Sequence, residues 1–176
     1  MLGDHSENAS QNVEKIKERT SQSPADCRND APILIEYLEH TEPEVRRSAA
    51  EAIKNLAEEC PDVCTPAIDH LQTCLEDPDD DVRRYSAYAL AKIANEKPGD
   101  VCKTVDSLIH SLSDDYKYSR RYAAWALKQI ADGEPETVHP AVDDLHDSLT
   151  DDYGRVRRYA AHALGKVANE YPNDVI

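Results

Sequence analysis

The sequence predicts an all-α fold of four helical hairpins, each 37 residues long, preceded by a capping helix. The first observation is an internal repeat whose period stays constant along the chain. The second is the spacing of apolar residues, which fits helices and nowhere shows the alternation of a strand. The third is a proline at each join between successive hairpins, where it ends one helix and opens the next. Together these observations predict a stack of repeats.

The repeat is clearest in the second helix of each hairpin. The segment VRRYSAYALAKIA begins at Val82, and its counterparts begin at Val45, Ser119 and Val156, each 37 residues from the next. Prolines and leucines recur with the same offset, at Pro24, Pro61, Pro98, Pro135, Pro172, Leu38, Leu75, Leu112 and Leu149. The period predicts an N-terminal polar segment with the capping helix at 1–23, repeats at 24–60, 61–97, 98–134 and 135–171, and the start of a truncated fifth repeat at 172–176.

Within a repeat we expect two helices. The first carries an apolar stripe from Val101 to Leu112, which Ser113, Asp114 and Asp115 then break. The second extends from about Val82 to Asn95, is rich in alanine, and stops before the next proline. Residues 11–20 occupy the place of a second helix in a preceding repeat, and they are more polar, as suits a capping helix.

The run Leu75-Glu76-Asp77-Pro78, followed by V-R-x-x-A-x-x-A-L-x-x-[IV] from Val82, resembles the HEAT repeat family, in its PBS-lyase-type form. This resemblance implies an armadillo-type right-handed α-α superhelix, a HEAT-like solenoid. It also implies a polar ladder between repeats, in which a turn Asp meets an Arg at the start of a second helix. The matching residues are Asp77, Asp114 and Asp151 with Arg83, Arg120 and Arg157. The first repeat has His40 in place of the Asp, which removes the basis for its ladder contact.

Helix geometry places the first arginine of each pair independently. Arg83 projects within about 20° of Leu90, on the buried side of its helix. A buried arginine needs a partner, and the Asp of a neighbouring turn could provide it.

The opposite side of the second helices carries arginines and aromatic residues, where a solvated helix would favour Glu and Lys. In stacks of the resembling family these helices line the concave inner face. Arg, Tyr and Trp are enriched at binding hot spots, so we expect a partner-binding surface there. Its predicted residues are Arg84, Tyr85, Tyr88, Arg121, Tyr122, Trp125, Arg158, Tyr159 and His162. Alternatively, the tyrosines at 85, 122 and 159 pack against the neighbouring repeat at the edge of the core.

Composition limits the partners. The net charge is −15, which opposes long-range attraction to nucleic acid or an anionic membrane. Such an acidic surface suits a salty cytoplasm, as in a halophile-like composition. The beginning of the sequence lacks the basic patch and apolar run of a secretory signal, so we expect a cytoplasmic protein.

Five cysteines form neither a paired framework nor a CxxC motif, and Cys27 and Cys64 align with core valines of other repeats.

The motifs of enzymes are missing from the sequence. It has no catalytic triad, Gly-rich phosphate loop or HExxH segment, so we expect no enzyme activity, no cofactor and no bound metal. The run 77–81 lacks the Gly and terminal Glu of a calcium loop. A zinc site at Cys60, Cys64, His70 and Cys74 is disfavoured because Cys64 belongs to the core.

The sequence therefore predicts a non-catalytic scaffold that binds a protein or peptide of acidic or aromatic character. One alternative is single-stranded nucleic acid, clamped by the same arginines and aromatic residues. Another, from the resemblance to lyases built of similar hairpins, is an accessory subunit of a lyase-type enzyme. Self-association is a further option, because the last hairpin leaves apolar residues uncapped around Leu164, Val167 and Ala168.

Overall fold

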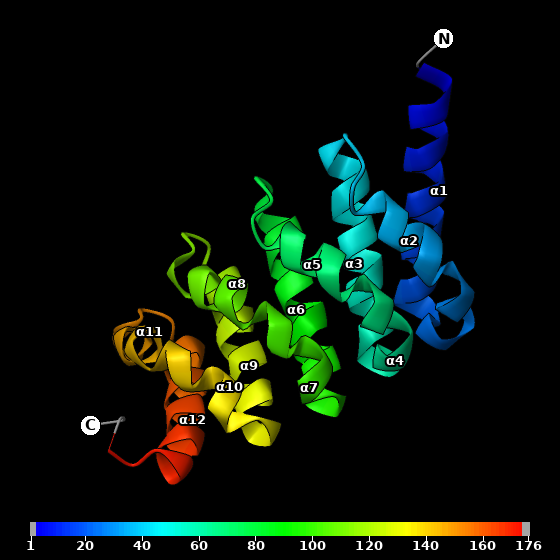
Figure 1. Cartoon of the computed structure of the whole chain (residues 1–176). Coiled ribbons are helices and arrows are strands. Elements are labelled where there is room, and N and C mark those ends of the chain that lie inside the picture. The colour runs from blue at the N-terminus through cyan, green and yellow to red at the C-terminus, as the bar shows by residue number, and fades with distance from the viewer. Residues whose placement is uncertain (1–2, 174–176) are drawn as a thin grey trace. The chain divides into compact units, whose positions relative to one another are not determined.

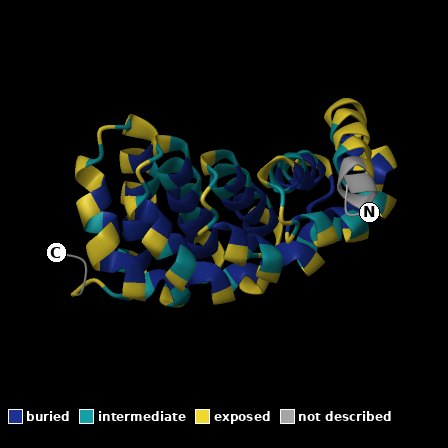
Figure 2. Cartoon of the chain, turned by 90° about the horizontal axis from the view of Figure 1, so that it is seen from above, coloured by how far each residue is buried: buried dark blue, intermediate teal, exposed yellow. Residues whose placement is uncertain are grey.

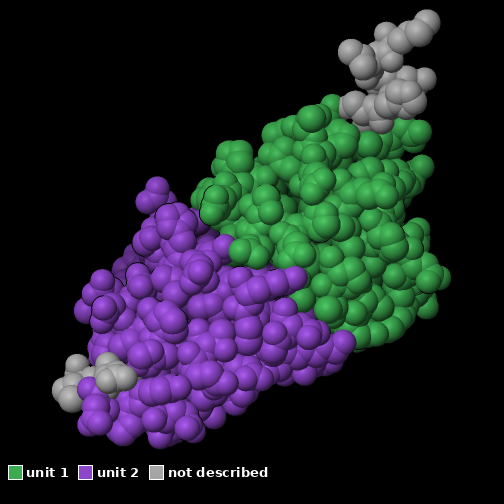
Figure 3. All heavy atoms as spheres, viewed as in Figure 1, with its two compact units in different colours: residues 1–89 green, residues 90–176 purple. Residues whose placement is uncertain are grey.

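The computed structural model describes residues 3–173, with side chains from residue 8 onward. Every regular element within these residues is a helix, so the predicted all-α class is confirmed. The chain divides into two compact units, Met1–Ala89 and Leu90–Ile176, and the division falls inside one long helix (Figure 3). We describe each unit by itself.

Unit 1 begins with a long helix against which the first hairpin packs. Its elements are α1 (Gly3–Gln22), η1 (Pro24–Asp30), α2 (Ala31–Tyr37), α3 (Pro43–Glu59), α4 (Pro61–Cys64), η2 (Thr65–Ala67), α5 (Ile68–Cys74) and the first part of α6 (Asp80–Glu96). α1 and α2 both pack against α3 (Figure 1). Val13, Ile16 and Thr20 are buried in this packing, while the other described side chains of α1 stay exposed or half-buried. The structure therefore has a mostly polar helix, α1, in the part of the sequence where the capping helix was predicted.

Unit 2 repeats the same pattern twice. After the end of α6 come α7 (Pro98–Val101), η3 (Cys102–Thr104), α8 (Val105–His110), η4 (Ser111–Ser113), α9 (Lys117–Gly133), α10 (Pro135–Val138), η5 (His139–Ala141), α11 (Val142–Asp147), η6 (Ser148–Thr150) and α12 (Gly154–Glu170). α9 and α12 lie side by side, α8 packs on α9, and α11 packs on α12 (Figure 1).

The first helix of each hairpin differs from the expected single stripe. Between Val101 and Leu112 the chain passes through α7, η3, α8 and η4 instead of one continuous helix. Pro66 and Pro140 supply one physical reason in two repeats, because proline has no N–H to continue the α-helical ladder. In the repeat between them, the hydroxyl of Thr104 donates to the carbonyl of Val101 at 2.9 Å. The second helices are regular and have 17 residues each.

The core of each unit lies where its helices pack together (Figure 2). Alanines on the second helices allow close approach, and larger side chains fill the remaining space. The largest fully buried residues include Leu34, Ile53, Leu56 and Leu71 in unit 1, and Leu90, Ile93, Leu108, Leu127, Ile130 and Leu145 in unit 2.

Cysteines contribute to this core. Cys27 and Cys64 are each 1% exposed, which confirms their predicted core positions. Cys60 and Cys74 are also buried, Cys102 is half-buried, and all five are free thiols. Burial raises the pKa of the Cys64 thiol to about 12 and that of Cys74 to about 11, so both stay protonated at neutral pH.

The predicted start of a fifth repeat falls partly outside the described residues, because the description ends at residue 173. Over the part of the chain that is described, no helix combines the length and the apolar character needed to cross a membrane.

Candidate functional site

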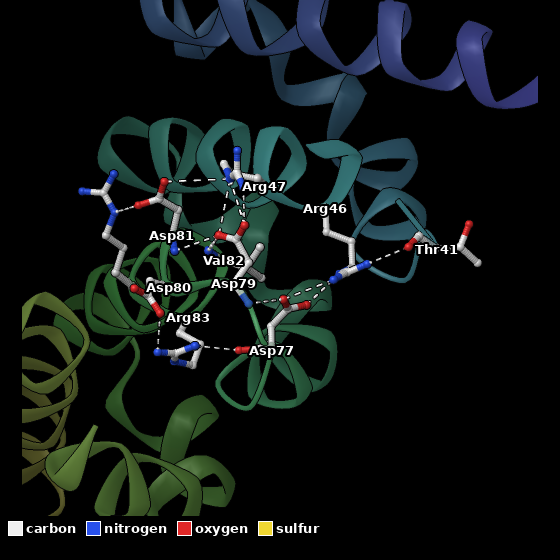
Figure 4. A network of polar contacts seen from close by, with 10 residues as sticks. Thr41, Arg46, Arg47, Asp77, Asp79, Asp80, Asp81, Val82 and Arg83 are labelled. Carbon is white, nitrogen blue, oxygen red and sulfur yellow. Dashed lines mark hydrogen bonds and ion pairs between the residues drawn. The ribbon is translucent and has the colours of Figure 1, made fainter. Parts of the chain in front are cut away.

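In two repeats, one in each unit, the first arginine of the pair joins its own turn to the turn of the following repeat. In unit 1, Arg46 donates from Nε to Asp77 Oδ2 at 2.7 Å and from Nη2 to Oδ1 at 3.2 Å (Figure 4). Its Nη1 donates to the carbonyls of His40 and Thr41, at 2.9 and 3.1 Å. This fork of contacts anchors one repeat to the next.

Unit 2 contains the equivalent contact. Arg120 donates to Asp151 at 2.7 and 3.3 Å and to Asp152 at 2.7 Å. Burial would raise the pKa of Asp151, but the hydrogen bonds from Arg120 and from the Tyr153 N–H, together with the positive charge of Arg120, outweigh it and lower the pKa below its usual value. Arg157 in the last repeat donates to the carbonyls of Asp151 and Asp152. Arg83 donates to the carbonyl of Asp77 and to the carboxylate of Asp80.

The turn residue itself has a second task in every repeat. Asp77 accepts the backbone N–H of Asp79 at 2.9 Å, and Asp114 and Asp151 accept the N–H two residues on, at 2.7 Å each. In the first repeat, His40 Nδ1 accepts the N–H of Glu42 at 3.2 Å. His40 thus stabilises the turn as the Asp does elsewhere. Arg46 keeps its ladder contact because its carboxylate partner, Asp77, belongs to the following repeat, so the His at position 40 does not remove it.

On the other side of the second helices, the arginines of unit 1 have carboxylate partners. Arg84 donates from Nε to Asp81 at 2.6 Å, and its guanidinium lies 4.3 Å from the Tyr85 ring centroid. Arg47 donates from Nε to Asp79 at 3.0 Å and lies 3.8 Å from Asp81 (Figure 4). The partly buried Tyr85 has its pKa raised to about 12, chiefly by burial. Tyr88 donates to Glu58 at 3.1 Å.

Unit 2 instead presents a row of aromatic rings across α9 and α12. The centroids of Tyr122 and Trp125 are 6.3 Å apart, and those of Trp125 and Tyr159 are 6.4 Å apart with the planes inclined by 26°. The Lys92 ammonium lies 5.8 Å from the Trp125 ring. All three rings are half-buried, which leaves part of each accessible. The row can stack against a flat or apolar group.

Two arginines accompany this row without a carboxylate partner among the described residues. The Arg121 guanidinium lies 4.7 Å from the Tyr122 ring, and that of Arg158 lies 5.6 Å from the Tyr159 ring. Nε of Arg121 is buried and has no hydrogen-bond acceptor. A buried donor without an acceptor is costly. Arg121 as a whole is half-buried, and guanidinium groups without a carboxylate partner bind carboxylate or phosphate.

His162, the last predicted residue, belongs to a separate charged cluster around Asp132. His162 Nε2 lies 2.9 Å from Asp132 Oδ1, Lys166 lies 3.0 Å from the same oxygen, and Lys128 also bonds the carboxylate. Despite burial, the bonds from these three groups hold the pKa of Asp132 well below its usual range. Near this cluster, the buried Gln129 donates to Asn95. His162 is therefore already engaged.

Sequence reasoning missed a second aromatic group at the start of α9. The Tyr118 ring lies 5.3 Å from that of Tyr116 and 5.9 Å from that of Tyr153, and Lys117 lies 5.3 Å from the Tyr118 ring. Tyr118, Tyr122 and Trp125 stand at positions i, i+4 and i+7, which share one helix face. Extending this stripe one turn toward the N-terminus would have found Tyr118 and its counterpart Arg155.

The described residues contain no group of three or more His, Cys, Asp or Glu side chains placed to hold a metal ion. His70 lies near Glu39, at 3.3 Å, beside a cavity of about 430 Å³ whose lining includes His40, Cys74 and Asp77.

Solved structures share the fold at low sequence identity. An engineered protein superimposes with a TM-score of 0.81 at 24% identity, over 95% of this chain and 76% of that chain. A computationally designed armadillo repeat protein for modular peptide recognition gives 0.82 at 22%, over 93% and 78%. A designed armadillo repeat protein in complex with the peptide (KR)4 gives 0.79 at 23%, over 99% and 82%. These likenesses establish the fold alone.

Sequence families give a more direct assignment. No curated protein matches the chain. The family described as HEAT-like repeat matches residues 43–93 and 118–167, more than half of the sequence. Both matched segments contain the second helices, with the paired arginines and the alanines that pack against the neighbouring helix. The chain belongs to the HEAT-like repeat family.

Proposed function

We propose that the chain is a non-catalytic scaffold that binds a protein or peptide through the outward side of α9 and α12 in unit 2. One observation carries this proposal: the stacked row Tyr122, Trp125 and Tyr159 lies beside Arg121 and Arg158, which have no carboxylate partner among the described residues. Half-buried aromatic rings offer large contact areas, and guanidinium groups offer directed polar contacts. Groups of this kind are what a binding surface needs.

The comparisons support peptide binding as the general kind of function. A designed armadillo repeat protein of similar fold is in complex with a peptide. This is an analogy of fold, and the site must be argued from its own residues. The equivalent positions in unit 1 support the proposal less strongly, because Arg84 is paired with Asp81 and its guanidinium is hydrogen-bonded to Tyr85.

A pull-down from lysate with the double variant Trp125→Ala/Arg121→Glu tests the proposal. Wild-type protein should capture a defined set of partners that the double variant loses. A matched control is Glu136→Ala/Asp143→Asn, which changes two exposed residues on the first helices of the same unit and should capture the wild-type set. Circular dichroism verifies that both variants stay helical. An unchanged set of partners in the double variant would contradict the proposal.

Single-stranded nucleic acid is the second candidate, and one observation favours it. α9 and α12 each carry four basic side chains and one acidic side chain, although the whole chain has a net charge of −15. Bases could stack on the aromatic row. A salt titration separates the candidates, because nucleic-acid affinity falls steeply with salt concentration while an aromatic-centred protein contact loses less.

A further inference from the structure

At the start of the second helices, the repeat positions that carry carboxylates in unit 1 carry none in unit 2. In unit 1, Arg47 bonds the carboxylate of Asp79 and lies near that of Asp81 (Figure 4). Arg84 bonds the carboxylate of Asp81. One period later, position 79 is occupied by Tyr116, and position 81 by Tyr118. Two periods later the same positions hold Tyr153 and Arg155. The carboxylates that neutralise the arginines in unit 1 therefore have no counterpart in unit 2.

As a result, three guanidinium groups on this side of unit 2, those of Arg121, Arg155 and Arg158, lack an ion pair among the described residues. Arg121 and Arg158 each contact a tyrosine ring, and Arg155, exposed on the first turn of α12, has no carboxylate within ion-pair distance among the described residues. By contrast, Arg120 in the same unit is paired with both Asp151 and Asp152. The unpaired set lies on the side of the helices that carries the aromatic row.

The charge of the helices strengthens this contrast. α3 has three basic and four acidic side chains, and α6 has three of each. α9 and α12 together reach +6. A local excess of positive charge on a strongly acidic chain attracts a complementary partner at short range, while the rest of the surface repels extended polyanions at long range.

We infer that this side of unit 2 binds an acidic peptide segment, with carboxylates on Arg121 and Arg158 and an aromatic side chain against Trp125. The inference rests on the proposed function and adds the chemistry of the partner. A guanidinium fork matches a carboxylate in two parallel hydrogen bonds, and stacking on a tyrosine ring orients the fork in advance.

The geometry also sets the spacing of the acidic residues. Packed helices lie about 8–10 Å apart, and an extended peptide advances about 3.3–3.6 Å per residue. Arg121 and Arg158 stand at the same position of the neighbouring helices α9 and α12. A peptide that crosses from one helix to the other therefore places carboxylates about three residues apart.

The experiment uses Trp125, the only tryptophan of the chain, as a fluorescent reporter of its own site. Full-length protein is titrated with three ligands: an eight-residue peptide with two glutamates three residues apart and a tyrosine between them, an alternating Lys-Arg peptide of the same length, and an eight-nucleotide oligo(dT). We expect the acidic peptide to bind at least 10-fold more tightly than either other ligand.

Two variants and a control test the arginines. Arg121→Gln should weaken binding of the acidic peptide by 10-fold or more. Arg47→Gln, the same position in unit 1, should change it by less than twofold. Tyr118→Asp copies the aspartate that stands one period earlier beside Arg84, so it should pair with Arg121 and weaken binding as much as Arg121→Gln does. This variant removes neither arginine nor Trp125.

The outcomes separate this inference from the proposed function. Tighter binding of the basic peptide at Trp125 would overturn the acidic assignment and leave the proposed function standing. Tighter binding of oligo(dT) would overturn both in favour of nucleic acid. Equal losses in Arg47→Gln and Arg121→Gln would contradict the assignment to unit 2. No fluorescence change with any of the three ligands would overturn the inference, and the proposed function would then fall only if the pull-down also failed.

Discussion

Arg46 and Asp77 show how a charged pair can link repeats inside a small core. Their side chains are 14% and 8% exposed, so both charges are largely withdrawn from water. The free-energy cost of removing these charges from water is offset by further hydrogen bonds. Arg46 also donates to two carbonyls, and Asp77 also accepts the N–H of Asp79. Removing either partner leaves the other charge without compensation.

We expect Asp77→Ala to destabilise the protein by about 2–4 kcal/mol, because removal of one partner of a buried ion pair costs about 3–5 kcal/mol and Arg46 keeps its carbonyl acceptors. Urea unfolding followed by circular dichroism measures the change. Asp80→Ala is the control, since Asp80 pairs with Arg83 but is 61% exposed, and exposed pairs contribute less than about 1 kcal/mol. Equal losses of unfolding free energy in the two variants would show that burial does not determine how much an ion pair stabilises this fold.

The lowered pKa of Asp151 predicts how this contact responds to acid. A carboxyl whose pKa is lower in the folded state stabilises the fold fully above its unfolded value and loses that effect as the pH falls through its folded value. We therefore expect wild type to be more stable than Asp151→Asn by a constant amount between pH 5 and pH 8. The difference should shrink from about pH 4 downward, since the unfolded pKa is about 3.9. The urea midpoints of both proteins at each pH measure this difference, and a difference at pH 2 as large as that at pH 7 would contradict the assignment.

At the scale of helices, the second helices could be predicted well and the first helices less well. The period gave Val82 to Asn95 for a helix that spans Asp80–Glu96. It did not reveal the breaks of the first helices, because the apolar stripe from Val101 to Leu112 has the same spacing whether each turn is α or 3-10.

The candidate site could be predicted in part for a similar reason. Periodicity identifies which residues point outward, so it predicts the same outward side of the second helices for Arg84 and Arg121. It does not say which of them has a partner, because that depends on residues in a turn or on an adjacent helix. Asp81 neutralises Arg84, whereas Tyr118 stands at the equivalent position beside Arg121, which has no carboxylate partner within the described part of the chain. Comparison of charges between repeats would have revealed this difference from the sequence.

Two glycines at different places on the long helices of unit 2 give opposite predictions. A Cβ at Gly165, inside α12, would meet no atom within 4 Å, whereas one at Gly133, at the end of α9, would lie 2.5 Å from the ring of Pro98. Gly165→Ala should raise stability by about 0.5–1 kcal/mol through helix propensity. Gly133→Ala should lower it by about 1–3 kcal/mol, because a proline ring cannot move aside easily. Thermal unfolding of both variants checks the signs, and stabilisation by Gly133→Ala would contradict the predicted contact.

At the scale of the whole molecule, the positive charge of α9 and α12 is embedded in a chain of net charge −15. Thus the first helices, turns and unit 1 together carry a larger negative charge than the total. Mutual repulsion of these carboxylates opposes the folded state, which holds them closer together than the unfolded chain does. Salt screens such repulsion over about 10 Å at 0.1 M and about 3 Å at 1 M.

We therefore expect the melting temperature to rise when sodium chloride is increased from about 0.02 M to 0.5 M at pH 7.5, where screening shortens the range of repulsion to a few ångströms. The ladder pairs Arg46–Asp77 and Arg120–Asp151 lose little in salt, because they are partly buried and hydrogen-bonded. Circular dichroism at 222 nm follows the transition. The same titration near pH 4.7, the isoelectric point, is the control, since net repulsion is absent there and the rise should largely disappear. A melting temperature that falls with salt at pH 7.5 would mean that surface ion pairs stabilise the fold more than the excess negative charge destabilises it.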